Sequence, residues 1–233
     1  RLRTVTGVQT CALPISDQAG VDVLAKMVHG TTVALLVGFV SMGIAGTIGI
    51  VMGALGGYFG GWVDMLTSRA TEIVMCVPTL VLMLAIVAIL PKPTIWHTMA
   101  IIGITGWTGI ARLTRGEFLR LKGSEFVMAA RAAGAGPVRI MLRHILPNAL
   151  APVLVPITFG IASAVLLESS LSFLGFGPPP PTASWGSVLN DARSNLAMWW
   201  LVAFPGLAIF LTVMAVNFIG DGLRDALDPR KVL

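Results

Sequence analysis

Long apolar runs, separated by shorter polar stretches, dominate the pattern of the chain. Five of them approach or reach the roughly 20 residues that a helix needs to cross the hydrocarbon core of a bilayer. They lie at about 32–55, 73–90, 95–113, 149–171 and 199–219, and the third, rich in glycine and threonine, is the weakest. The pattern predicts an all-α, polytopic membrane protein with five transmembrane helices.

Small residues and prolines punctuate these runs. Glycines let helix backbones approach closely in lipid, so the six in the first run indicate that this helix packs against other spans. Each proline in or near a run predicts a kink, because neighbouring helices can satisfy the carbonyl group that proline leaves free. The glycines are Gly38, Gly43, Gly46, Gly49, Gly53 and Gly56, and the prolines are Pro78, Pro152, Pro156 and Pro205.

Composition supports a membrane environment. Of the 233 residues, 55% are hydrophobic and only 12% are charged, whereas soluble domains carry about 25% charged residues. The net charge of +5 does not come from a basic stripe interleaved with aromatic residues. We therefore expect a lipid membrane and no nucleic acid as the surroundings of this chain.

The residue types that carry chemistry are sparse and scattered. The only cysteines are Cys11 and Cys76, and the three histidines are His29, His97 and His144. We expect no disulfide, no metal site and no cofactor bound by this chain. No arrangement of nucleophile and base suggests an enzyme. A phosphate-binding glycine-rich loop with lysine is also missing, so ATP hydrolysis has to come from a partner.

Basic residues orient the predicted helices. From residue 17 onward, eleven Lys and Arg residues fall on one side, seven of them between the third and fourth runs, and only Lys26, Lys92 and Arg193 fall on the other. The side richer in Lys and Arg faces the cytoplasm in most membrane proteins. Five spans then place the C-terminus in the cytoplasm and residue 1 outside.

The long polar stretch at about 116–147 contains two short helical patterns. Between them, Gly134 and Gly136 permit a sharp turn, and Pro137 suits the first position of the next helix. We expect Pro147 to end that second helix. The apolar positions are Phe126, Val127, Ala130 and Ala133 in the first pattern and Val138, Met141, Leu142 and Ile145 in the second. The stretch is suited to docking into a partner; an amphipathic segment lying on lipid headgroups is the alternative.

Several motifs make a resemblance specific. The stretch "MAARAAGAGPVRIMLRHILPN" at 128–148 resembles the signature loop of inner-membrane permeases of binding-protein-dependent ABC importers. "GGYFGGWVD" at 56–64, "LSFLGFGPPPPTASWGSVLNDAR" at 171–193 and "NFIGDGLRDALDPR" at 217–230 are similar to the dipeptide/oligopeptide/nickel permeases, as is "FPGLAI" at 204–209. The resemblance runs from about residue 17 to the end of the chain.

The resemblance implies which loop residues couple to an ATPase. Ala129, Ala130 and Gly134 take the second, third and glycine positions of the motif, and Met128 stands where its leading Glu is usual. Glu125, on the same helical face, is a candidate replacement; an ordinary solvated acid at a helix start is the alternative. The closing part of the motif is Ile145, Leu146 and Pro147.

The resemblance also implies the assembly. The chain would be a six-span half of a heterodimeric pore in a bacterial or archaeal cytoplasmic (inner) membrane, with its first span missing. Its partners would be a second homologous permease subunit, two cytoplasmic ABC ATPase subunits that bind ATP and Mg²⁺, and an extracytoplasmic solute-binding protein. Peptides or a related small solute such as nickel would be carried.

Two features outside the loop are further candidates. Glu168 lies close to the outer end of the fourth run, and an acid in a membrane span is a candidate for the pore or a gate by default; a structural hydrogen-bonding role is the alternative. The proline run at 177–182 cannot be helical and predicts a rigid external loop. With 185–193 it forms a candidate landing surface for the solute-binding protein, or a simple spacer.

The first sixteen residues match none of these motifs. "VTGVQTCALPI" at 5–15 resembles the translation of a sequencing-adapter oligonucleotide, so we treat 1–16 as an expected artefact and 17–233 as the transmembrane domain; a genuine short N-terminus is the alternative. Two other readings of the whole chain remain, a secondary transporter and a structural subunit of a membrane complex. The first should show inverted repeats and ionisable residues at mid-membrane.

Overall fold

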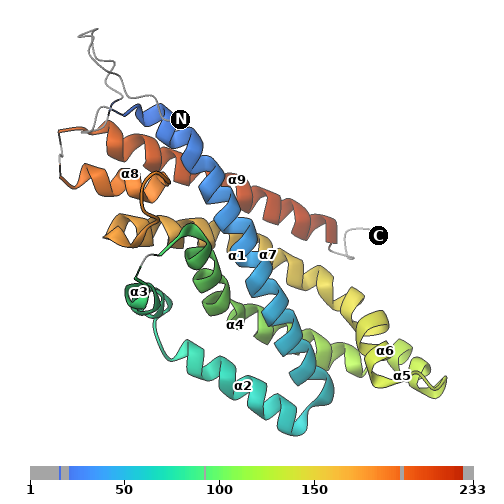
Figure 1. Ribbon diagram of the computed structural model, residues 1–233. Helices are drawn as coiled ribbons and strands as arrows, with labels where there is room; N and C mark the ends of the chain where they lie inside the picture. The colour runs from blue at the N-terminus through green and yellow to red at the C-terminus, as the bar shows by residue number, and fades with distance from the viewer. Residues whose placement is uncertain (1–15, 17–20, 92, 195–196, 228–233) are drawn as a thin grey trace. The chain divides into compact units, whose positions relative to one another are not determined.

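The protein is almost entirely helical, which confirms the all-α prediction. The computed structural model describes Ser16 and residues 21–91, 93–194 and 197–227 (Figure 1). The elements in chain order are α1 (Val23–Phe59), α2 (Gly61–Met75), α3 (Thr79–Ile89), α4 (Ile95–Lys122), α5 (Glu125–Ala132), α6 (Pro137–Arg139), η1 (Ile140–Ile145), α7 (Leu146–Leu171), η2 (Ser172–Phe176), α8 (Trp185–Ala192) and α9 (Trp200–Leu227).

Within the residues that the structure describes, three helical segments are long and apolar enough to cross a membrane. They are α1, the continuous segment Pro137–Phe176 and α9, and they contain the first, fourth and fifth predicted spans. The third predicted span lies in α4, which has 28 residues but is more polar because it continues into "RLTRGEFLRLK". The α2–α3 pair, bent by 82°, makes a fourth candidate if it is one broken span.

The second predicted span is therefore wrong as a single straight helix. The first helix of the pair ends at Met75 and the next begins at Thr79, with Pro78 in the break. Proline lacks the N–H of a helix interior and clashes with the carbonyl four residues before it, and it also disfavours helical geometry at the preceding residue. The prolines of α7 and α9, in contrast, lie inside continuous helices.

The chain divides into two compact units, and the first is built around α8. This unit comprises the described residues of 1–41, 83–102 and 161–216. The indole of Trp185 is buried and donates a hydrogen bond of 3.0 Å from Nε1 to the carbonyl oxygen of Met27. The other buried apolar residues of its core include Val23, Ala34, Val165, Val188, Ala192 and Leu201.

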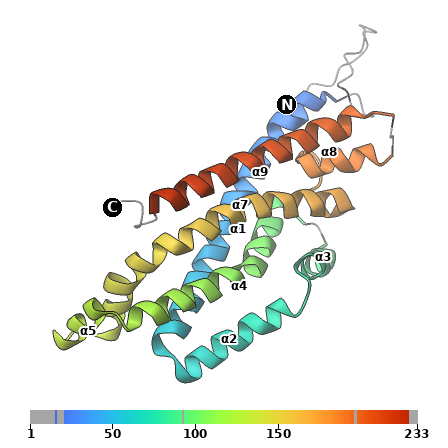
Figure 2. The ribbon, with the colours of Figure 1, turned by 180° about the vertical axis from the view of Figure 1, so that it is seen from behind.

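The second unit has its core at the base of the polar loop. It comprises the described residues of 42–82, 103–160 and 217–233. The ends of α1 and α4 meet α5, η1 and the start of α7 there, and Figure 2 shows α5 beside the end of α4. The buried residues of this cluster are Ala54, Tyr58, Phe118, Leu121, Val127, Ile140, Met141, Ile145 and Ala149.

Within the second unit, glycines bring α1 against α4. A Cβ atom added at Gly53 would lie 2.4 Å from the carbonyl oxygen of Ala111, and one at Gly49 would lie 2.7 Å from Cβ of Ile110. Such distances are too short for any side chain, so these positions confirm the expected packing role. Gly43 does not share it, because among the described residues no atom outside its own helix turn lies within 4 Å of its added Cβ.

Candidate functional site

The turn between α5 and α6 depends on one glycine. Gly134 has a φ of +78°, a left-handed conformation that costs other residues about 1–2 kcal/mol. Its N–H donates to the carbonyl oxygen of Arg131 at 2.9 Å, and the N–H of Ala135 donates to that of Ala130 at 3.0 Å. These two bonds form a Schellman motif, which ends a helix and satisfies its last carbonyl groups. The predicted sharp turn at Gly134 is confirmed.

The second loop helix runs directly into the membrane span. Pro137 occupies its first turn, as predicted. Pro147, however, does not end it but is the second residue of α7. The wider turns of η1 precede it, with the N–H of Leu146 bonded to the carbonyl oxygen of Met141, five residues back. This π-helical geometry lets the helix continue, because it changes the positions of the carbonyl groups with which the proline ring would clash.

One face of the loop is packed into its own chain. Val127 and Ile145 have no exposed surface, and Ile140 is 1% exposed. These side chains belong to the same buried cluster as Tyr58 at the end of α1 and Phe118 near the end of α4. The loop is therefore attached to two long helices through a hydrophobic base.

The opposite face of the loop leaves apolar side chains uncovered. Phe126, Met128, Val138 and Leu142 are between 42% and 64% exposed. Exposed apolar residues that gather on a surface mark an interaction site. We call these four, together with the exposed basic residues Arg131, Arg139 and Arg143, the exposed loop face.

The loop residues singled out from the sequence fall into two groups. Glu125, Met128, Ala129, Gly134 and Pro147 are exposed, and Glu125 lies in the first turn of α5. The rest are covered: Ala130 and Leu146 are half-buried, and Ile145 is fully buried. Exposed members can contact a partner, whereas Ile145 packs the base of the loop.

Sequence reasoning missed part of the exposed loop face. Val138 and Leu142 appeared to share one apolar face with Met141 and Ile145, but the structure exposes the first two and buries the others. In the sequence, the bulky exposed residues are spaced like core residues. A signal was present in the arginines that interrupt the pattern, since they indicate a face that stays in contact with water.

Glu168 does not lie on an open surface of this chain. It is 1% exposed, and its Oε1 accepts a hydrogen bond of 2.6 Å from the Ser172 hydroxyl, one helical turn later. Its Oε2 has no hydrogen-bond partner among the described residues. The contact with Ser172 matches the structural alternative, and a role in the pore stays a prediction.

The connection between α7 and α9 contains a helix that the sequence did not suggest. Residues 177–184 are non-helical, as expected from the proline run. Then α8 begins with a capping box, in which Ser184 and Ser187 bond to one another's backbone N–H groups. Its end is tied back by an ion pair of 3.1 Å between Lys26 and Asp191. A cavity of about 850 Å³ lies between this helix and the proline run.

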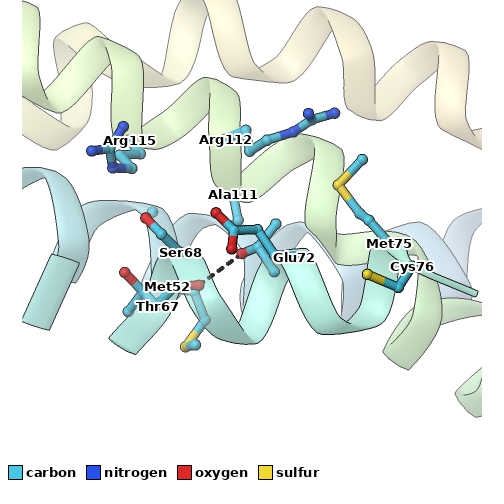
Figure 3. Close-up of a pocket in the computed structure, with 11 residues that line it drawn as sticks. Met52, Thr67, Ser68, Glu72, Met75, Cys76, Ala111, Arg112 and Arg115 are labelled. Carbon is cyan, nitrogen blue, oxygen red and sulfur yellow. Dashed lines mark hydrogen bonds between the residues drawn. The ribbon is translucent and has the colours of Figure 1, made fainter. Parts of the chain in front are cut away.

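A second cavity, of about 660 Å³, lies in the second unit (Figure 3). Thr67, Ser68 and Glu72 of α2 line it from one side, and Arg112 and Arg115 of α4 from another. No group of three or more His, Cys, Asp or Glu residues that could hold a metal ion occurs among the described residues.

Long apolar helices, together with a basic loop that is packed at its base and exposed at its tip, define a class: a multi-pass membrane protein. Residues 45–232 match the family "binding-protein-dependent transport system inner membrane component". The chain belongs to this family, so it is the permease subunit of an ABC importer and a multi-pass protein of the inner membrane.

Relatives of this family align along most of the chain. The dipeptide transport system permease protein DppC of Alkalihalophilus pseudofirmus is 42% identical over 216 residues, which is 92% of this chain and 71% of the relative. The di/tripeptide permease protein DppC of Pseudomonas aeruginosa is 41% identical over the same shares. Oligopeptide permease protein OppC of Haemophilus influenzae is also 41% identical, over 92% of this chain and 69% of its own length.

Solved structures show the same fold. A chain of the MetNI methionine ABC transporter in an inward-facing conformation superposes with a TM-score of 0.72, covering 88% of this chain and 97% of that one. The sequence identity is 18%, so this similarity concerns the fold alone. Family membership also makes this chain a transport subunit rather than an enzyme, with the ATPase on partner subunits. It implies a solute-binding protein and a second permease as further partners.

Proposed function

We propose that this chain forms half of the translocation pore of a peptide importer and that its exposed loop face binds the ATPase. The supporting observation is the loop itself, which combines a fully packed base with an uncovered apolar and basic tip. Movement of a bound ATPase would reach the long helices through that base, because Tyr58 and Phe118 belong to it.

Short peptides are the solute class that we propose. The support comes from the relatives named above, which are described as dipeptide, di/tripeptide and oligopeptide permeases. Nickel, the other solute considered from the sequence, has no comparable support. The basic loop and the C-terminus would lie in the cytoplasm, where the two ATPase subunits bind ATP and Mg²⁺, and no cofactor would be held by this chain.

Uptake into vesicles tests the solute class. The complex is reconstituted with its second permease and two ATPase subunits, and labelled dipeptide is supplied with the solute-binding protein. We expect ATP-dependent uptake that unlabelled di- and tripeptides suppress and that Ni²⁺ leaves unchanged. Uptake suppressed by Ni²⁺ alone would overturn the peptide assignment.

Gly134→Arg tests the loop assignment. Arginine is strained at a φ of +78° and adds bulk at the turn, so we expect loss of ATPase co-purification and of transport. Gly134→Asn separates the two effects, because asparagine tolerates this conformation better than other residues. It should retain more ATPase binding than the arginine variant. Normal assembly and transport by Gly134→Arg would show that the loop does not couple the subunits.

A further inference from the structure

The motif "GGYFGGWVD" at 56–64 lies outside the exposed loop face. It forms the end of α1, the turn and the start of α2. Gly60 and Gly61 have φ values of +68° and +52°, so the chain reverses through two left-handed residues. An added Cβ at Gly56 would lie 2.5 Å from the Thr67 hydroxyl, which shows how closely α2 begins beside α1.

An ion pair joins the start of α2 to α4. The Arg115 guanidinium donates from Nε to Oδ1 of Asp64 and from Nη2 to Oδ2, the latter at 2.6 Å. The two residues are 51 positions apart, and their side chains are 38% and 23% exposed. Such a two-bond contact fixes orientation as well as distance, which a single bond between point charges cannot do.

The same part of α4 is attached to the loop and to the end of α1. Phe118 and Leu121 lie in the buried base of the loop. The ammonium group of Lys122 donates a hydrogen bond of 2.5 Å to the carbonyl oxygen of Tyr58 and lies 5.6 Å from the centre of its ring. The α1 end, the α4 end and the loop therefore form one packed body.

Beyond the ion pair, α2 separates from that body. The cavity of about 660 Å³ extends along the helix as far as Met75 and Cys76, and Figure 3 labels Arg112 and Arg115 of α4 among the residues that line it. Only Thr67 and Thr71 of α2 are buried. The ion pair is thus the contact that joins the first turn of α2 to α4, and from Thr67 to Cys76 this segment lines the cavity.

We propose that Arg115 is a positioning residue for energy coupling: through Asp64 it makes α2 move with the loop when the ATPase closes. The proposal rests on the proposed function, because the loop has to be the ATPase contact. Arg115 receives the displacement through α4, and the ion pair passes it to the first turn of α2. The glycine motif keeps the corner close enough for this bond to form.

Variants of the complete transporter test the pair. Arg115→Gln and Asp64→Asn each remove one partner, Arg115→Lys keeps the charge but not the two-bond geometry, and Asp64→Arg combined with Arg115→Asp exchanges the charges. The control is Arg69→Gln, because Arg69 is exposed and pairs with Glu72, three residues later in the same helix.

Two measurements separate coupling from folding. Co-purification of the ATPase subunits reports docking, and it should be unchanged in all variants. The ratio of peptide transported to ATP hydrolysed reports coupling. This ratio should fall about fivefold or more in Arg115→Gln and Asp64→Asn, which is a typical size for coupling between sites. It should fall less in Arg115→Lys. In the variant with exchanged charges, the ratio should recover at least partly.

The thiol of Cys76 reports the position of α2. This residue is exposed, borders the cavity and lies just beyond the end of the helix, so its thiol modification rate, measured in a Cys11→Ser background, follows the position of α2. The rate should change between nucleotide-free and ATP-bound complexes, and this change should disappear in Arg115→Gln but persist in Arg69→Gln.

An ATP-dependent change of equal size in Arg115→Gln, or an unchanged coupling ratio with docking retained, would overturn the proposal. The proposal would also be contradicted if Arg115→Gln kept both docking and transport while Gly134→Asn and Gly134→Arg both lost docking. Normal assembly and transport in Gly134→Arg would instead contradict the proposed function.

Discussion

Two short helices of this protein, α5 and α8, are each eight residues long and each lie in a connection between longer helices. They differ in what covers their apolar side chains. In α8, Trp185, Val188 and Ala192 are all buried by the same chain, whereas α5 buries only Val127 and leaves Phe126 and Met128 exposed. One helix is completed by its own unit, and the other presents a surface that another protein can cover.

The starts of the two helices show the same difference. Ser184 caps α8 through a full capping box. Ser124 precedes α5 but makes no cap; its hydroxyl donates to the carbonyl oxygen of Leu121 at 2.6 Å instead. Local sequence alone therefore stabilises α8 more than α5, which depends on packing at its base. The following predictions test this contrast, from the largest expected effect to the smallest.

Trp185→Ala should lower the free energy of unfolding the most, by about 3–5 kcal/mol, because it removes a fully buried aromatic ring and its hydrogen bond to Met27. Thermal unfolding of the purified complex in detergent measures this loss. Trp199→Ala is the control, since its indole is 62% exposed. Equal losses in the two variants would show that α8 is not anchored by Trp185.

Ile145→Ala and the pair Val138→Ser with Leu142→Ser should have opposite effects. Ile145→Ala removes part of a buried side chain from the loop base and should lower the free energy of unfolding by about 2–5 kcal/mol. The Val138→Ser and Leu142→Ser pair changes only exposed positions, so the unfolding temperature should hardly change. The affinity for the ATPase should fall about tenfold, or ~1.4 kcal/mol. Binding of purified ATPase to the reconstituted permease pair measures the affinity. Unchanged affinity would remove the exposed loop face from the interface.

Gly186→Ala should destabilise the first unit by about 1–3 kcal/mol through overpacking. An added Cβ would lie 2.4 Å from the carbonyl oxygen of Ser169, so α8 has to move away from α7. Gly43→Ala is the matched control, because open space surrounds that position and alanine favours helix over glycine by roughly 1 kcal/mol. A neutral Gly186→Ala would mean that the contact between α8 and α7 is loose.

Ser184→Ala should cost about 1 kcal/mol, within the 0.5–2 kcal/mol range of lost helix caps. Ser124→Ala removes no cap and should change stability less. The unfolding temperatures of both variants, measured by differential scanning in the same detergent, provide the comparison. A larger loss for Ser124→Ala would indicate that the local stability of α5 has been underestimated.

Much of the fold followed from local patterns. Apolar runs located α1, α7 and α9, because the hydrocarbon core demands long stretches without charge. Gly134 marked its turn, since only glycine adopts a φ of +78° without strain. The signature around that glycine led to the importer family before any helix was placed, and residues 45–232 match that family.

Other features depended on contacts that no local pattern contains. The helix could have continued through Pro78, as it does through the prolines inside α7, but the structure has a bend of 82° there. The continuation of the helix through Pro147 required the π turns of η1. Likewise, α8 follows a proline run in a polar loop, where its buried face is visible only once Val23 and Leu201 lie against it.

The sequence by itself determined that this is a helical membrane subunit of an ABC importer and where its loop turns, because span length, backbone conformation and motif spacing are local properties. Only the tertiary structure decided which loop side chains are exposed, since Val138 and Ile145 have the same apolar character but different neighbours. It also decided that Asp64 meets Arg115, 51 residues away. Contacts between distant segments arise from packing, and packing is a property of the whole unit.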